Sequence, residues 1–198
     1  MPSRRRQPER STRVRDAERS RAALLDAAQA EFAEKGFSGG RVDAIAARAG
    51  VNKQLIAYYF GGKQGLYDAV TERRQTLVAE FDTPETPLPE LALQYFAAFG
   101  DNPDLERIFL RENLDQDPGD VEYEPDSDEV VDLRRRQQAG EIGDELDPAF
   151  VLLFLEAMTV SGSLFPAEAK RLTGLDPRSA EFRRQAADQL SAIVRRLA

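Results

Sequence analysis

The chain has 198 residues, of which 41% are hydrophobic and 31% are charged, so it is long enough for a sizeable core and has the composition of a globular protein. It contains no cysteine and no histidine, which excludes disulfides, Cys/His metal sites and every catalytic relay that depends on either residue. The net charge of −8 is divided into +4 on residues 1–82 and −12 on residues 83–198, an asymmetry that favours a module for polyanions joined to a larger acidic one.

The first stretch of the chain is rich in arginine and holds two prolines, so we expect a disordered basic arm over residues 1–17. Arginine arms can enter the minor groove of DNA, although a solvated tail is the simpler interpretation. No apolar block follows the arginines, and no apolar run reaches the ~20 residues that a membrane span needs. We therefore expect a cytoplasmic protein without a signal peptide.

The next stretch predicts a helix from Ser20, a residue type favoured as an N-cap, to about Lys35. Its apolar residues fall on one stripe, formed by Leu24, Leu25, Ala28 and Phe32. Gly36 fits the position directly after a helix, where positive φ is common, and Phe37 can then fold back on the last turn.

Residues 41–60 have the pattern helix, tight turn, helix. Apolar residues at helical spacing mark the first of these helices, namely Val42, Ile45, Ala46 and Ala49. Gly50 permits the turn, and Asn52 can cap a second helix whose buried side continues through Ile56, Tyr59 and Phe60. In a helix-turn-helix the second helix enters the major groove, and the donors and the cation that follow Asn52 suit that place.

The remaining pattern is also helical. We expect helices at residues 63–81, 88–100, 103–115, 128–139, 150–165 and 178–197, with an acidic loop of unassigned role at 117–126. No strand-like alternation of any length occurs in the sequence. We therefore predict an all-α protein of about nine helices, with a helix-turn-helix domain at 18–82 and a larger helical domain at 83–198.

Three segments, LLDAAQAEFAEKGF, VDAIAARAGV and NKQLIAYYFGGKQGLYDAV, occur in the order and at the separation seen in one known family. On these segments the chain resembles the TetR family of transcriptional regulators, over residues 19–70, about a quarter of its length. The resemblance implies a homodimeric repressor that binds a palindromic operator in double-stranded DNA. It also implies that a small-molecule effector, bound by the larger domain, releases the operator.

The resemblance assigns roles to the start of the second helix of the motif. Lys53 and Gln54 match the positions where the family contacts bases, and Asn52 stands at the cap, where Ser or Thr is more usual. Leu55 replaces a frequent Thr and offers only apolar contact, for example to a thymine methyl group. A lysine that is merely solvated at a helix start is the alternative interpretation of Lys53.

Four further residues match family positions that touch the DNA backbone. Tyr58 and Tyr59 stand where aromatic side chains meet sugar and phosphate, and Lys63 matches a lysine that meets a phosphate at the start of the next helix. Arg41 replaces a common Ser or Thr phosphate contact. The alternative interpretation is that Tyr58 and Tyr59 both belong to the hydrophobic core.

The resemblance places the dimer interface on the last two long helices, at residues 150–165 and 178–197. The wide apolar face of the last helix needs a cover, which agrees with a dimer, although packing within one subunit is the alternative. For the effector we expect an apolar cavity with a few polar groups. The candidate effector residues are Phe96, Phe99, Arg107, Phe109, Arg111, Phe154, Glu156 and Phe165.

We expect no catalytic residue, no metal site and no cofactor. A helical enzyme or a small-molecule carrier that keeps the helix-turn-helix as a scaffold is the alternative from another class. Against it stand the missing histidine and cysteine. A DNA-binding activator without a ligand is a third alternative, which only an effector pocket would separate from the repressor.

Overall fold

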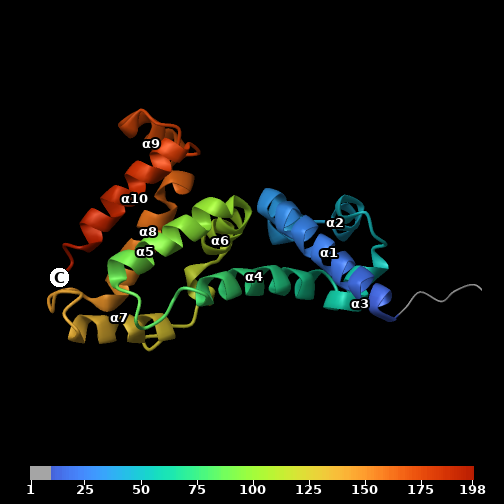
Figure 1. Cartoon of the computed structure of the whole chain (residues 1–198), viewed down its shortest axis with the longest axis horizontal. Helices are drawn as coiled ribbons and strands as arrows, with labels where there is room; N and C mark the ends of the chain where they lie inside the picture. Colours follow the sequence, from blue (N-terminus) through green and yellow to red (C-terminus); the bar gives the residue numbers. More distant parts are fainter. Residues whose placement is uncertain (1–9) are drawn as a thin grey trace, which may run out of the picture. The chain divides into compact units, whose positions relative to one another are not determined.

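The computed structural model describes residues 10–198, with side chains from Val14 onward, and this part of the chain is all-α (Figure 1). It contains ten α-helices, where the sequence predicted about nine, and one 3-10 turn at Pro118–Asp120. The described residues form two compact units, the first ending at Arg74 and the second covering Gln75–Ala198. The boundary between them falls inside a helix, Lys63–Ala79 (α4).

The first unit contains α1 (Arg10–Gly39), α2 (Val42–Ala49), α3 (Gln54–Phe60) and most of α4. Leu24 and Phe32 of α1, Ile45 of α2, Ile56 of α3 and Leu66 of α4 are all buried, so the predicted apolar stripes form one core. The ring of Phe37 lies 6.2 Å from that of Phe32, which confirms that this residue folds back on the helix before it.

The first helix differs from the prediction at its start. It begins at Arg10 rather than at Ser20, whose hydroxyl donates to the carbonyl of Asp16 inside the helix. The expected cap was wrong because residues 10–20 contain no glycine or proline to end a helix. Residues 10–17 of the predicted arm are therefore helical, and residues 1–9 lie outside the described part. The predicted interruption near Lys35 is confirmed, since Gly36 has φ 69° within α1.

The second unit contains the remaining helices: α5 (Leu88–Asp101), α6 (Pro103–Asp115), α7 (Asp128–Gln138), α8 (Pro148–Leu164), α9 (Pro166–Thr173) and α10 (Ala180–Val194). Helix α9 is not among the elements predicted from the sequence. Its signals were present, because Pro166 stands in the first turn and Gly174 ends the helix with φ 74°. A helix of eight residues is too short to show a clear helical periodicity of apolar residues.

Helix α5 is central to the second unit, and Figure 1 shows α8 and α10 beside it. A buried apolar cluster joins Leu88 and Ala92 of α5 to Leu133 of α7, Leu155 of α8 and Leu190 of α10. Gly162 permits the close approach of α8 to α10, because a Cβ there would lie 2.8 Å from the ring of Phe182 in α10.

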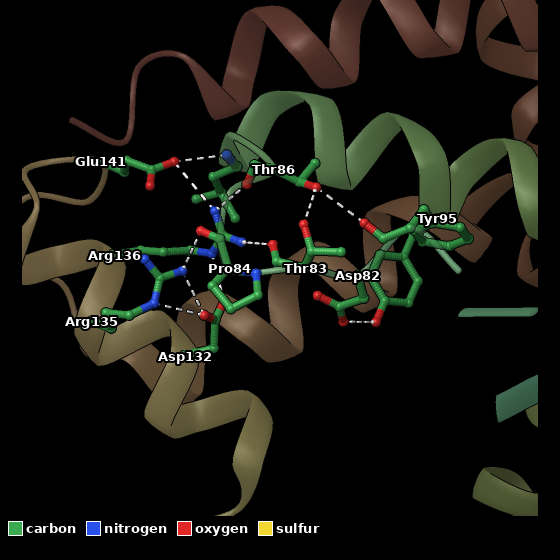
Figure 2. A network of polar contacts seen from close by, with 11 residues as sticks. Asp82, Thr83, Pro84, Thr86, Tyr95, Asp132, Arg135, Arg136 and Glu141 are labelled. Atoms are coloured by element: carbon green, nitrogen blue, oxygen red, sulfur yellow. Dashed lines mark hydrogen bonds and ion pairs between the residues drawn. The ribbon is translucent and has the colours of Figure 1, made fainter. Parts of the chain in front are cut away.

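A buried arginine ties the segment between α4 and α5 to α7 (Figure 2). Arg136 has 0% exposure, and its guanidinium donates to Asp132 at 2.5 Å and to the carbonyl of Thr86 at 2.6 Å. It also lies 3.4 Å from Glu141, which accepts the N–H of Leu88 at the start of α5 at 2.7 Å. Although burial raises the pKa of Asp132, hydrogen bonds from Arg136 and its neighbour outweigh it and lower that pKa.

Among the described residues, no single helix is both long and apolar enough to cross a membrane. The pair Pro148–Leu164 and Pro166–Thr173 meets the length and composition criteria together, but it is bent by 86° at its break.

Candidate nucleic-acid interface

The two helices of the motif meet at a tight turn. Gly50 ends α2 in the left-handed region with φ 67°, and its N–H and that of Val51 bond back to carbonyls of the last turn of α2. Asn52 then accepts the N–H of Gln54 at 2.9 Å through its side chain, which confirms the predicted capping role. Local residue choice thus sets where α3 begins.

Helix α3 buries Ile56 and presents its other faces outward. Lys53 and Gln54 are exposed at its start, and Tyr58 is 79% exposed, so Tyr58 is no core aromatic. Leu55 and Tyr59 are half-buried. The ring of Tyr59 lies 5.0 Å from that of Tyr58 in an edge-to-face arrangement. Tyr59 therefore packs against the exposed ring of Tyr58, and part of its own side chain stays exposed to solvent.

The two cations near the start of α3 differ in whether they have an ionic partner. Lys53 forms an ion pair with Asp43 of α2, with a nitrogen to oxygen distance of 3.0 Å, and both side chains are largely exposed. Arg41 is exposed at the start of α2, and its side chain forms no ion pair with the described residues. A DNA phosphate near both residues would therefore pair directly with the guanidinium of Arg41, and the ammonium of Lys53 would have to leave Asp43 to pair with it.

Lys63 begins α4 directly beyond α3. Its ammonium donates to the carbonyl of Ser38 at 3.3 Å and lies 4.7 Å from the centre of the Phe37 ring. The half-buried side chain is thus held near a helix start, where a phosphate is favoured. Gly65 permits the close approach of α4 to α3, because a Cβ there would lie 1.9 Å from the carbonyl oxygen of Phe60.

One important residue of this unit was missed by the sequence analysis. Glu31 of α1 is 1% exposed and accepts from Lys35 at 2.9 Å and from the N–H of Arg41, at the start of α2, at 3.3 Å. The hydrogen bond from Lys35 is the main reason why the pKa of this carboxyl is lowered. Glu31 therefore fixes α2 against α1, and the Glu-x-x-x-Lys spacing was the available signal.

Stability of the first unit should depend on pH through Glu31. Because the folded-state pKa lies below the usual 4.5, the contribution is present above about pH 4.5 and is lost as the pH falls through the folded pKa. Replacing Glu31 with Gln should cost about 1–3 kcal/mol at pH 7 and less at pH 3.5. Urea unfolding of both proteins at the two pH values measures this, and a pH-independent difference would contradict it.

The candidate effector residues lie on α5, α6 and α8 or, for Phe165, directly after α8, and their surroundings differ. Phe99 and Phe109 pack with ring centres 5.4 Å apart. Arg107, Arg111 and Glu156 have exposed side chains, Phe165 is 58% exposed and Phe154 is 60% exposed. The remaining candidate, Phe96, lines a hollow of about 280 Å³ together with side chains of α8 and α10.

Several known proteins are similar in sequence to this chain, and the similarity includes the helix-turn-helix. The pattern that defines the bacterial regulatory proteins of the tetR family matches residues 24–70. The HTH-type transcriptional repressor SCO4008 of Streptomyces coelicolor is 33% identical over 169 residues, which cover 80% of this chain and 85% of that protein. The HTH-type transcriptional regulator RutR of Escherichia coli K12 is 28% identical over 196 residues, which cover 92% of both.

The fold is likewise shared with solved structures. The crystal structure of the transcriptional regulator SCO4942 from Streptomyces coelicolor matches with a TM-score of 0.70 and 29% identity, covering 89% of this chain and 97% of that one. Regulators of this kind bind operator DNA and an effector, and the family is not enzymatic. The chain, with its helix-turn-helix of α2 and α3, thus belongs to the TetR family of DNA-binding transcriptional regulators.

Proposed function

We propose that the protein is a repressor that binds a palindromic operator as a homodimer in the cytoplasm and leaves it when an effector binds the second unit. The observation that carries the proposal is the outer face of α3, where Lys53, Gln54 and Tyr58 are exposed beside the turn at Gly50. An amide and an ammonium at the N-terminal end of a recognition helix are groups that can bond to base edges.

The DNA-backbone contacts are proposed for the residues around that face. Arg41, Tyr59 and Lys63 surround α3, and Lys63 is already oriented by Ser38 and Phe37. Asn52 caps the helix, and Leu55 lies beside Gln54 with apolar surface to offer a thymine methyl group. In this proposal the backbone contacts set the register, and Gln54 reads sequence.

The homodimer is proposed on α8 and α10. Phe150, Phe154, Ala157 and Ser161 are exposed at spacings of four, three and four residues, which places them on one face of α8. A stripe that includes two exposed phenylalanine rings is unusual on a free surface and needs a cover. A twofold dimer would cover it and hold two copies of α3 for the two halves of a palindrome.

The effector site is proposed within the second unit. Phe96, Phe99 and Phe109, on α5 and α6, would supply its apolar surface. Arg107, Arg111, Phe154, Glu156 and Phe165 remain candidates only if the effector reaches the outer surface, because their side chains are exposed.

The proposal is tested by titrating fluorescent DNA from upstream of the gene, and a scrambled control, with the protein while anisotropy is recorded. Tight binding to the natural sequence alone is the expected result. Equal binding to both DNAs would contradict a sequence-specific repressor. If neither is bound, selection from random DNA decides, and failure to enrich any sequence would overturn the proposal.

Replacing Gln54 with Ala should cost about 1–3 kcal/mol of operator affinity at one base pair and leave the other positions unchanged. Selection from random DNA with the wild type and the variant measures the preference at each position. Gln75→Ala, an exposed glutamine in the last part of α4, is the matched control. An unchanged preference profile for Gln54→Ala would show that this residue does not read a base.

A further inference from the structure

An acidic side chain lies directly beside the proposed DNA-reading residues. Asp43 stands in the first turn of α2, and its carboxylate lies 3.0 Å from the ammonium of Lys53 at the start of α3. Both side chains are more than half exposed, at 61% and 63%. A carboxylate at this place costs DNA affinity, because it repels phosphates. A useful role for Asp43 therefore has to come from its effect on Lys53.

The position of this ion pair is set mainly by the aspartate. Asp43 has a short side chain, and a negative charge in the first turn of a helix is favoured by the helix dipole. Lys53 reaches it with a long, flexible side chain from the residue before α3. Bound DNA therefore meets the ammonium and the carboxylate together.

A guanine base can bind Lys53 while the ion pair stays intact. An ammonium has three N–H donors, and the ion pair is made to one carboxylate oxygen, so donors remain for a second acceptor. The O6 and N7 atoms of guanine are uncharged acceptors in the major groove and are common partners of lysine. Lys53 can thus bond to guanine without leaving Asp43.

A phosphate is a less favourable partner for the same lysine. It is negatively charged, so a phosphate in contact with Lys53 would lie close to the carboxylate of Asp43 and be repelled by it. Arg41 provides the contrast, because its exposed side chain forms no ion pair with the described residues. A phosphate can bind Arg41 without displacing an acid, whereas at Lys53 it has to compete with one.

We infer that Asp43 is a specificity-determining residue, whose negative charge keeps Lys53 off the phosphates and available to guanine. On DNA that lacks the right base, Lys53 then adds little affinity, and on the operator it adds a base contact. Specificity increases because a like charge penalises the wrong partner more than the right one. The inference rests on the proposed operator binding and names a residue that sets how selective this binding is.

The test uses the full-length variant Asp43→Asn, which keeps the size and an oxygen acceptor and removes the charge. Anisotropy at 150 mM salt measures its affinity for the operator that the wild type selects from random DNA and for a scrambled sequence. Binding to scrambled DNA should be at least about tenfold tighter, because each copy gains about one phosphate contact. Operator affinity should change less than about threefold, so the ratio of the two affinities falls.

Three control measurements separate the ion pair from a general effect of charge. Asp43→Glu keeps the charge and should keep the ratio within about threefold of that of the wild type. Asp26→Asn removes an acid of α1 that pairs with Arg73 of α4 at 2.6 Å, and the ratio should stay unchanged. In the Lys53→Met background, Asp43→Asn should change both affinities by the same factor.

An unchanged ratio for Asp43→Asn would overturn the inference. An equal fall of the ratio in the Lys53→Met background would do the same, because the effect would then not pass through Lys53. A similar fall for Asp26→Asn would show that the loss of any acid acts alike, which also contradicts it. These results leave the proposed function intact, whereas a wild type that selects no sequence, or binds both DNAs equally, would remove both.

Discussion

Replacing Arg136 with Met is expected to lower the free energy of unfolding of the second unit by about 3–5 kcal/mol. The guanidinium is fully buried, and the substitution leaves Asp132, Glu141 and the carbonyl of Thr86 without their shared donor. Methionine fills a similar space, so the loss comes mainly from uncompensated polar groups rather than from a cavity. Urea unfolding monitored by circular dichroism measures the change.

Arg134→Met is the matched control on the same helix. Arg134 also forms an ion pair of 2.5 Å, with Asp126, but both side chains are largely exposed, so the loss should be at most about 1 kcal/mol. Removing the acid as well, in Arg136→Met with Asp132→Leu, should recover part of the stability, because the half-buried carboxylate that has lost the Arg136 guanidinium is then absent. Equal losses at Arg134 and Arg136 would contradict the role assigned to burial.

The same arginine shows where sequence reasoning reaches its limit. Arg134, Arg135 and Arg136 are consecutive in a polar helix, and nothing local distinguishes the one that is buried. Its burial depends on the carbonyls of Thr83 and Thr86, which are 53 and 50 residues away in the chain. Such a partner exists only once α7 has packed against the segment between α4 and α5.

The helix-turn-helix could be predicted because its determinants are local. Gly50 takes the positive φ of the turn, Asn52 bonds to an N–H two residues on, and Ile56 lies at helical spacing from its core partners. The candidate effector residues lacked such determinants. Apolar spacing identified Phe154 and Phe165 as members of a helix face, but not whether that face is covered within one chain, and both are exposed.

Operator binding should weaken steeply with salt, by about a thousandfold between 50 and 200 mM. The proposed interface brings three cationic side chains of each copy to the DNA, Arg41 and Lys63 at the backbone and Lys53 at the base edges, and each displaces counterions, so a dimer neutralises about six phosphates. Each neutralised phosphate contributes about −0.9 to the slope of log affinity against log salt, so the slope should be about −5. Anisotropy titrations at four or five salt concentrations measure it.

The slope also separates one bound copy from two. A single copy contacts about three phosphates and should show a slope near −3. Lys63→Ala should reduce the slope by about 1 for each copy, and thus by about 2 for a dimer, while weakening all sequences alike. Lys170→Ala removes the same charge from α9 of the acidic second unit and should leave the slope unchanged. A slope near −3 that Lys63→Ala lowers by only 1 would mean that one copy binds alone. The proposal that two copies of α3 bind one operator would then be wrong.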